Sequence, residues 1–273
     1  MPTIIVTTDF SRSAHNALRY ACSIAKQAEH SELVLLNIYT MPGSYAGDGV
    51  SLAAVSDSIT GNEQKLKEEF KWLEENNPGL SVKYKEVTGD FVECLQQQVK
   101  EENATMVVMG APDEYGELWS WDADILNALT HLSVPVLTVP CKVAYTPVLH
   151  VAFACMLENV GSHTPLVAIK KLIAFTGAKL DIVTVMVPGG NAEAALKGQQ
   201  VLDNMLKGID TEYYKIYDAH VVAAIGNFVA AHATDMLLVQ PRKHGIWYNL
   251  FHKSYSKELA KLNTIPVMAL PAE

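Results

Sequence analysis

The chain has 273 residues, 49% hydrophobic and 19% charged, a balance typical of a globular protein with one or two well-packed domains. Its formal net charge of −9 argues against general nucleic-acid binding. The sequence has neither an apolar run of the ~18–20 residues that span a bilayer nor a basic region before its apolar start, so we expect a cytoplasmic protein without membrane or signal segments.

The first half of the chain alternates strand-like and helix-like segments. Apolar, β-branched runs predict strands at 3–8, 32–39, 81–87, 105–110 and 135–140. Stretches with helical periodicity lie between them, at 12–29, 51–76, 90–102 and 122–132. This alternation predicts parallel βαβ units with right-handed crossovers, and the nearly continuous apolar strands fit a sheet that is covered on both faces.

The second half repeats the same order of elements. Its strand-like segments lie at 149–155, 179–187, 211–217, 235–240 and 266–271. Its helix-like segments lie at 160–176, 190–207, 218–232 and 250–262. The chain therefore contains two copies of one structural unit.

The two copies can be aligned residue by residue. Asp9 aligns with Met156, 147 positions later, and the strand 106–110 aligns with 236–240, 130 positions later. The change in offset indicates that the second copy lacks about 17 residues between its second and fourth strands. In the first copy this extra material is a Gly- and Ser-rich stretch that leads into a longer helix.

Charge also separates the copies. Residues 1–143 contain 10 Lys and Arg against 20 Asp and Glu, whereas residues 144–273 contain 11 against 10. Many of the acidic residues lie in 62–76, whose helical spacing is typical of a solvated helix face. We place the boundary in the connection 141–147, which gives an acidic domain 1–143 and a near-neutral domain 144–273.

Four segments of the first copy carry a family resemblance: IIVTTDFS (4–11), LVLLNIY (33–39), VVMG (107–110) and PVLTVP (135–140). They resemble the universal stress protein family, and the likeness covers almost the whole chain twice, so the chain looks like a tandem member. The resemblance implies a doubly wound α/β fold with a five-stranded, mostly parallel sheet in each domain. It also implies that the last strands, near 136–139 and 267–270, pair antiparallel as an internal pseudo-dimer.

Some members of this family bind ATP and others do not. The resemblance implies that binders use an Asp at the end of the first strand, an apolar residue at the end of the second, and a G-x2-G-x9-G-[S/T] loop after the fourth. Glycines let the backbone approach phosphate, and N–H groups at a helix start hold it. Such a ligand lies at the carboxyl ends of the strands.

The first domain matches only the start of that pattern. Four residues stand at the expected positions: Asp9, Ile38, Met109 and Gly110. Asp113 then replaces the second glycine, and Ala123 and Asp124 replace the G-[S/T] pair. An aspartate removes the backbone freedom of glycine and puts negative charge where a phosphate would lie.

The second domain departs from the pattern in the opposite way. Its loop is basic, with Lys243 in place of the second glycine, Lys253 in place of the third, and Ser254 at the [S/T] position. Val185 fills the apolar position of the second strand, but Met156 replaces the aspartate. Positive charge and a serine at a helix start favour an anion. Neither domain keeps the whole motif.

These features also have simpler explanations. Asp9 precedes the predicted helix 12–29, where an aspartate often caps the helix or makes a local polar contact. The basic loop of the second domain could equally be a solvated surface or a subunit contact. Both alternatives stay open on the sequence.

Metal and catalytic motifs find little support. Nine histidines and four cysteines form no tight cluster and no CxxC pair, so we expect reduced thiols. The acidic loop of the first domain offers four oxygen ligands to a divalent cation, but without EF-hand spacing: Asp113, Glu114, Asp122 and Asp124. The common hydrolase, zinc-protease and P-loop motifs do not occur in the sequence.

Three functions follow as expectations. The first is a non-catalytic stress-response protein that acts through interaction or ligand sensing, needs no cofactor and does not bind ATP in the usual manner. Its partners would be a second copy or an unidentified protein, not nucleic acid or a membrane. The second is binding of a nucleotide or anionic metabolite through Lys243, Lys253 and Ser254, and slow nucleotide hydrolysis is a weaker third.

Overall fold

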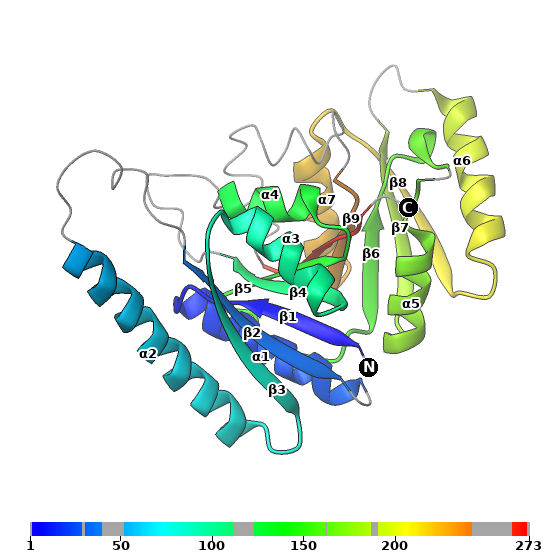
Figure 1. Cartoon of the computed structure of the whole chain (residues 1–273). Coiled ribbons are helices and arrows are strands. Elements are labelled where there is room, and N and C mark those ends of the chain that lie inside the picture. Colours follow the sequence, from blue (N-terminus) through cyan, green and yellow to red (C-terminus); the bar gives the residue numbers. More distant parts are fainter. Residues whose placement is uncertain are drawn as a thin grey trace.

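The structure is a computed structural model, and it describes residues 2–28, 31–39, 52–111, 123–161, 163–186, 191–241 and 264–271. Figure 1 shows helices on both faces of a central sheet. The predicted helix 250–262 lies outside the described residues, as does most of the basic loop that precedes it.

The first half forms the strands and helices that its sequence predicts. Its strands are β1 (Thr3–Thr7), β2 (Glu32–Tyr39), β3 (Ser81–Thr88), β4 (Ala104–Ala111) and β5 (Val136–Pro140). Its helices are α1 (Arg12–Gln27), α2 (Leu52–Asn76), α3 (Phe91–Glu101) and α4 (Ala123–His131). These bounds agree with the predicted segments to within two residues.

The second half has the same order. Its strands are β6 (His150–Ala154), β7 (Lys179–Met186), β8 (Thr211–Tyr217), β9 (Met236–Val239) and β10 (Val267–Ala269). A short 3-10 helix, η2 (Leu157–Asn159), precedes the described helices α5 (Leu166–Thr176), α6 (Ala192–Met205) and α7 (Val221–Ala231).

The start of α5 differs from the prediction. The periodicity of 160–176 predicts a helix from residue 160, but the helix begins at Leu166. Pro165 is the N-cap residue, and a proline has no backbone N–H to donate to a preceding turn. Thr164 holds the connection instead, because its Oγ1 accepts a hydrogen bond from Gly161 N at 3.0 Å.

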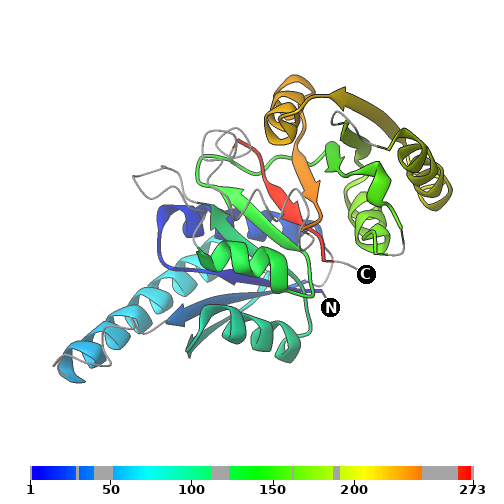
Figure 2. The same ribbon diagram turned by 90° about the horizontal axis from the view of Figure 1, so that it is seen from above.

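All ten strands form one sheet in the order β3-β2-β1-β4-β5-β10-β9-β6-β7-β8. Neighbouring strands run parallel within each half, and β5 and β10 run antiparallel where the halves meet. Figure 2 shows the two halves on either side of this junction. The α/β fold class and the antiparallel pairing of the last strands are confirmed.

The strand register repeats between the halves. Ile4 of β1 pairs with Met106 of β4, and Val151 of β6 pairs with Met236 of β9. These two pairs are related by the offsets of 147 and 130 that the sequence alignment predicts. The repeat is therefore visible in the hydrogen-bonded frame as well as in the sequence, while the exact boundary at residue 143 stays a prediction.

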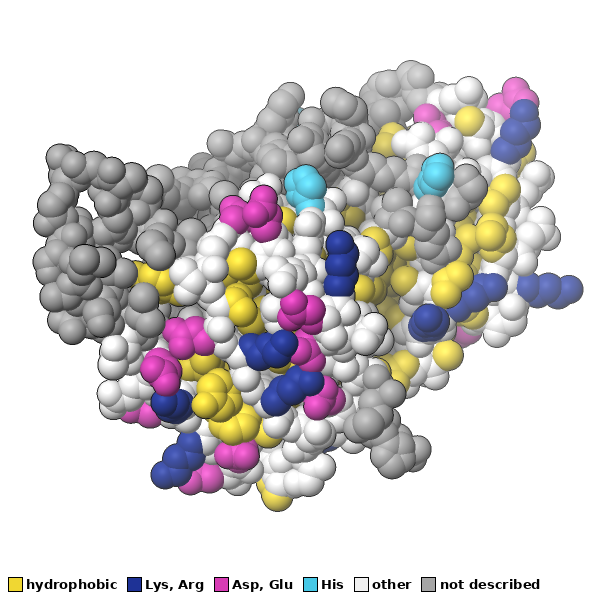
Figure 3. All heavy atoms as spheres, viewed as in Figure 1, with side chains coloured by type: hydrophobic (Ala, Val, Ile, Leu, Met, Phe, Trp, Pro, Cys, Tyr) yellow, Lys and Arg dark blue, Asp and Glu magenta, His cyan; other side chains and the backbone are white. Residues whose placement is uncertain are grey.

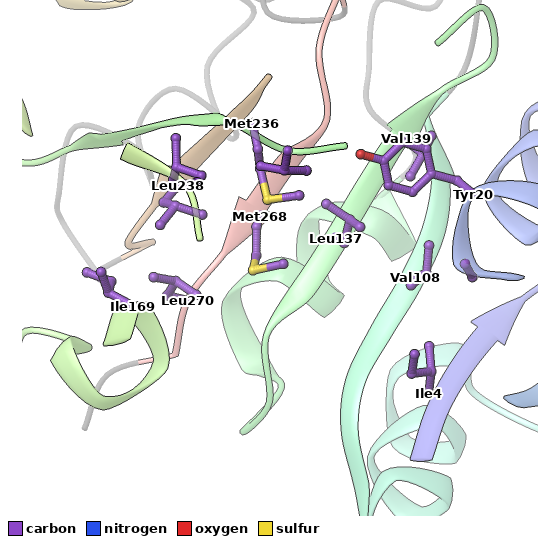
Figure 4. Close-up of a cluster of buried hydrophobic side chains, with 14 of the residues drawn as sticks. Ile4, Tyr20, Val108, Leu137, Val139, Ile169, Met236, Leu238, Met268 and Leu270 are labelled. Carbon is purple, nitrogen blue, oxygen red and sulfur yellow. The ribbon is translucent and has the colours of Figure 1, made fainter. Parts of the chain in front are cut away.

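The junction between β5 and β10 is symmetric about its central pair. Leu137 pairs with Met268, its own counterpart in the repeat, and Thr138 pairs with Val267. Thr138 Oγ1 also donates to the Val267 carbonyl at 3.1 Å. Figure 4 shows Leu137 and Met268 in a cluster of buried apolar side chains at this junction. A pseudo-twofold axis thus passes through the Leu137–Met268 pair.

Two apolar layers, one on each face of the sheet, hold the helices. One layer packs α3, α4 and α7 on the sheet, and the other packs α1, α2, α5 and α6 on the opposite face. Each layer contains buried residues from both halves. None of the helices in the described part of the chain is long and apolar enough to traverse a bilayer.

The acidic residues of the first half lie mainly at its surface. Figure 3 shows basic and acidic side chains interspersed on one face of this half. Among the paired side chains of this half, Lys83 pairs with Glu32 and Glu102, and Lys85 pairs with Glu101 and Glu102. Glu102, which both lysines share, is 10% exposed, so this network balances charge at a partly buried position.

The second crossover differs most between the halves. It contains α2, with 25 residues, in the first half and α6, with 14 residues, in the second. Gly198 of α6 lies so close to η2 that an added Cβ would stand 1.8 Å from the Leu157 carbonyl oxygen. In the shorter crossover, Gly198 therefore allows α6 to pack closely on η2.

One buried carboxyl interrupts the apolar layer of the second half. Asp181 of β7 is 4% exposed and holds the position that Val34 holds in β2. Its Oδ1 has no hydrogen-bond partner among the described residues, and Lys179 Nζ is 3.9 Å away. Burial raises the pKa of the Asp181 carboxyl, with the neighbouring Lys179 opposing this shift.

We expect Gly198→Ala to lower the free energy of unfolding by about 1–3 kcal/mol, because the new Cβ meets backbone atoms of η2. The matched control is Gly61→Ala in α2, where no atom lies within 4 Å of an added Cβ. That change should raise stability by up to about 1 kcal/mol through helix propensity. Urea unfolding of both variants measures the difference, and a Gly198→Ala variant at least as stable as the wild type would contradict the packing role of Gly198.

We expect Asp181→Val to raise the free energy of unfolding at neutral pH, because it removes a buried charge where the repeat holds a valine. The pKa of Asp181 is raised in the folded state. The wild type therefore loses stability as pH rises from the unfolded-state pKa through the folded-state pKa. The gain should be larger at about pH 7 than at about pH 4. Denaturant unfolding at both pH values measures it, and equal gains would rule out ionisation as the cause.

Candidate functional site

The carboxyl ends of β1, β2 and β4 meet at one edge of the first half. β1 pairs in parallel with both neighbours, so the residues that end these strands are brought together. Asp9 follows β1, Ile38 lies near the end of β2, and Met109 and Gly110 lie near the end of β4. All four sequence-predicted positions of the first domain therefore belong to one region of the structure, where a parallel α/β fold places its ligands.

Asp9 holds the turn that leads into α1. Its side chain is exposed, and its Oδ1 accepts a hydrogen bond from Ser11 N at 2.9 Å. The helix cap itself is Ser11, whose Oγ accepts from Ala14 N at 3.2 Å. Of the two simpler explanations for Asp9, the local polar contact agrees with the structure and the helix cap does not.

The same turn carries a constrained backbone. Phe10 has a φ of 65°, a value uncommon for a residue other than glycine. Thr8 Oγ1 accepts a hydrogen bond from Phe10 N at 3.0 Å and donates to Glu69 Oε2 at 2.6 Å. Sequence reasoning missed Thr8 and Glu69, because 61 positions separate them and only the fold brings α2 to the end of β1.

Asn37, near the end of β2, stabilises this turn through a hydrogen bond. It is 4% exposed, and its Nδ2 donates to the Thr8 carbonyl at 2.7 Å. Its Oδ1 is buried without a hydrogen-bond partner among the described residues. Asn37 therefore ties the end of β2 to the end of β1 and leaves one acceptor unused at this edge.

Gly110 allows β4 to approach α1. A Cβ added at this position would stand 2.4 Å from the Ser13 carbonyl carbon and 2.5 Å from Ala14 N. Those distances are far below ordinary contact, so the first turn of α1 packs directly on the glycine. The requirement for glycine here has a packing cause in addition to any role in binding phosphate.

The apolar positions of the pattern belong to the core. Met109 is 3% exposed and lies in the layer under α3 and α4, and Ile38 packs against that layer. Val185, the counterpart of Ile38 in the second half, is 6% exposed in the same layer. Burial explains the apolar character of all three positions.

The second domain shows only part of its predicted site. Met156 begins the connection through η2, and Gln240, which stands in place of the first glycine, donates through Nε2 to the His163 carbonyl. Lys243, Lys253 and Ser254 lie outside the described residues. The proposed anion contacts of this domain therefore stay predictions.

Within the described ranges no group of three or more His, Cys, Asp or Glu side chains is placed to hold a metal ion. Of the four acidic-loop residues considered as cation ligands, Asp113, Glu114 and Asp122 lie outside the described residues.

The chain is similar to universal stress proteins over its whole length. The family model described as the universal stress protein family matches residues 1–140. A universal stress protein from Archaeoglobus fulgidus DSM 4304 is similar in structure, with a TM-score of 0.72 at 16% identity over 99% of this chain and 96% of that chain. A putative universal stress protein from Pseudomonas aeruginosa UCBPP-PA14 has a TM-score of 0.57 at 12% identity, over 100% and 94% of the two chains.

A protein of unknown function from Pseudomonas aeruginosa PAO1 is also similar, with a TM-score of 0.58 at 14% identity over 99% of this chain and 93% of that chain. No match was found among curated proteins. At these identities the solved structures show a shared fold, and the shared fold includes both halves. The family match covers more than half of the 273 residues, and we conclude that the chain belongs to the universal stress protein family.

Proposed function

We propose that this chain is a non-catalytic member of the family that acts as a ligand-sensing or interaction protein and does not bind ATP in the usual manner. The observation that carries the proposal is the structural use of the motif residues. Asp9 accepts a hydrogen bond from Ser11 N, and the backbone of the first turn of α1 packs directly on Gly110. Asp9 and Gly110 are thus accounted for by the junction of β1, β4 and α1, and the other two matching residues, Ile38 and Met109, by their place in or against the apolar core.

The sequence of the following loop supports the same proposal. Asp113 stands in place of the second glycine of the pattern, and Asp124 in place of its Ser or Thr. A single like charge ~6 Å from a phosphate, at an effective dielectric of ~20, costs roughly 3 kcal/mol before screening. Two such charges would remove an ordinary micromolar affinity for a nucleotide.

The alternative is binding of a nucleotide or anionic metabolite in the second domain. Its support is the charge of the loop, where Lys243, Lys253 and Ser254 stand at the positions that Asp113, Ala123 and Asp124 hold in the first domain. The aspartate of the pattern is absent from the second domain, since Met156 stands there. In this alternative the second domain would bind the anionic group of a ligand and would lack the aspartate that contacts a nucleoside.

We also propose a cytoplasmic location and partners of two kinds, a second copy of the chain or an unidentified protein. The net charge of −9 argues against nucleic acid as a partner.

Thermal unfolding with ATP, ADP, AMP and inorganic phosphate tests the proposal. We expect no shift with the adenine nucleotides, whereas a ligand at 100 times its dissociation constant would add about 2.7 kcal/mol of stability. A clear shift with ATP would sink the proposal. If Lys253→Glu then abolished the shift and Asp113→Gly did not, the site would be in the second domain, and the reverse result would locate it in the first.

Gly110→Ala separates packing from phosphate binding. We expect it to lower the free energy of unfolding by about 1–3 kcal/mol in the absence of any ligand, because the added methyl overlaps the backbone of α1. Urea unfolding measures the change. A variant that keeps wild-type stability but loses stabilisation by a nucleotide would show that Gly110 serves phosphate instead.

A further inference from the structure

A groove between α1 and α2 opens beside Phe10 and Ser11, the residues that follow β1. Its volume is about 690 Å³, within the range of ~300–1,000 Å³ that small-molecule sites occupy. Six lining side chains carry the argument: Arg12, His15 and Arg19 from α1, and Lys65, Glu69 and Trp72 from α2. We propose that this groove binds a small organic anion with a planar group, at a site separate from the strand-end position of Asp9 and Gly110.

Three cations (Arg12, Arg19 and Lys65) and two carboxylates (Glu68 and Glu69) line the groove, so its lining has an excess of one positive charge although its domain is acidic. Arg12, Arg19 and Lys65 are exposed, and none of them makes an ion pair within the described part of the chain. Lys67 and Lys71 of the same helix α2, outside the groove, are instead paired with glutamates one turn away. The three cations that line the groove are therefore not neutralised by an ion pair within the described residues and can face an external anion.

Arg12 stands where a cation is unfavourable for the fold. It is the first residue of α1, and the first turn of that helix contains no acidic residue. The positive end of the helix macrodipole repels a cation at this position. A negatively charged ligand beside Arg12 would relieve that repulsion and would also face the start of the helix.

A buried carboxylate orients the histidine of the groove. The Glu69 side chain is 8% exposed, and its Oε1 lies 3.2 Å from His15 Nδ1. The other carboxylate oxygen of Glu69, Oε2, accepts a hydrogen bond from Thr8 Oγ1. With Nδ1 turned toward Glu69, the opposite ring nitrogen of His15 is directed away from the carboxylate, and the half-exposed ring is held in one orientation. Glu69 is occupied in this way, so Lys65 one turn earlier is not paired with it.

Trp72 supplies the planar surface of the groove. Its ring meets the His15 ring edge to face, with centroids 4.5 Å apart and an interplanar angle of 60°. The Phe10 ring lies at 5.8 Å from Lys65 Nζ, measured to the ring centroid. Aromatic rings beside exposed cations fit a ligand that combines a flat apolar part with a negative group.

The second half shows how the same place looks when it is closed. The ends of α2 and α6, Asn76 and Met205, are 129 positions apart. At this offset Gly198 is the counterpart of Glu69. The carbonyl group of Leu157 packs directly on Gly198. A glycine thus lets η2 pack on the helix in the second half, whereas in the first half Glu69 bonds to Thr8 and His15 and a charged groove lies beside it.

This inference rests on the proposed ligand-sensing role, and it names a site and a ligand class for that role. It does not depend on either strand-end loop. Thr8 connects the two regions, because it bonds to Glu69 in the groove and precedes Asp9 in the chain.

Ligand-detected NMR titration of the full chain tests the site with two planar anions, salicylate and phenyl phosphate, and with neutral benzamide as the uncharged analogue. We expect both anions to bind in preference to benzamide. The double variant Arg12→Glu, Arg19→Glu should weaken them by about tenfold or more, since two charge-assisted contacts become repulsive. Lys71→Glu reverses an exposed charge on α2 outside the groove and should leave the affinity within about twofold.

Unfolding controls separate binding from folding. Arg12→Glu removes a cation from the first turn of α1, so this variant should be at least as stable as the wild type while it binds the anions less. The proposal is overturned if neither anion binds at up to about 10 mM, a weak limit for fragments of this size, if benzamide binds equally well, or if the double variant keeps wild-type affinity. If one of these results were found and ATP, ADP and AMP did not shift the unfolding temperature, the proposal that the chain does not bind ATP in the usual manner would stand. Only the proposed anion site in the groove would then be wrong.

Discussion

The antiparallel contact between β5 and β10 is the constraint on which the rest of the molecule depends. Among the described residues three pairs form it, and the central pair, Leu137 and Met268, is almost fully buried. Both apolar layers continue across this contact. Separating the halves would expose the middle of each layer as well as two strand edges, which is costly because unpaired edges and apolar surface both favour association.

This contact fixes a symmetric frame while the crossovers remain free to differ. The strand registers repeat on both sides of the junction, but the second crossover holds a long helix in one half and a short one in the other. A charged residue that differs between the halves lies in this crossover. The same position carries Glu69, bonded to Thr8 and His15, in the first half and Gly198, packed on η2, in the second.

The sequence predicts the frame well because burial on both faces imposes long apolar strands twice, at offsets that the structure repeats. It predicts the start of α5 poorly, since apolar periodicity continues through Pro165 while backbone hydrogen bonding does not. The groove was not predicted at all. His15 and Glu69 meet across 54 positions, and the pattern of 62–76 indicates only a solvated helix. Gly110 matches a phosphate motif, yet its close approach to α1 is visible only in three dimensions.

The axis through Leu137 and Met268 has a consequence for how such a molecule would respond to a ligand. Two separate copies would join only as their concentration allowed, and they would carry identical sites. Covalent linkage makes the pairing independent of protein concentration. It also permits a groove in one half without a twin in the other. A single chain of this kind would bind one ligand in its groove with a simple hyperbolic response, and cooperativity between grooves would require a second copy of the chain.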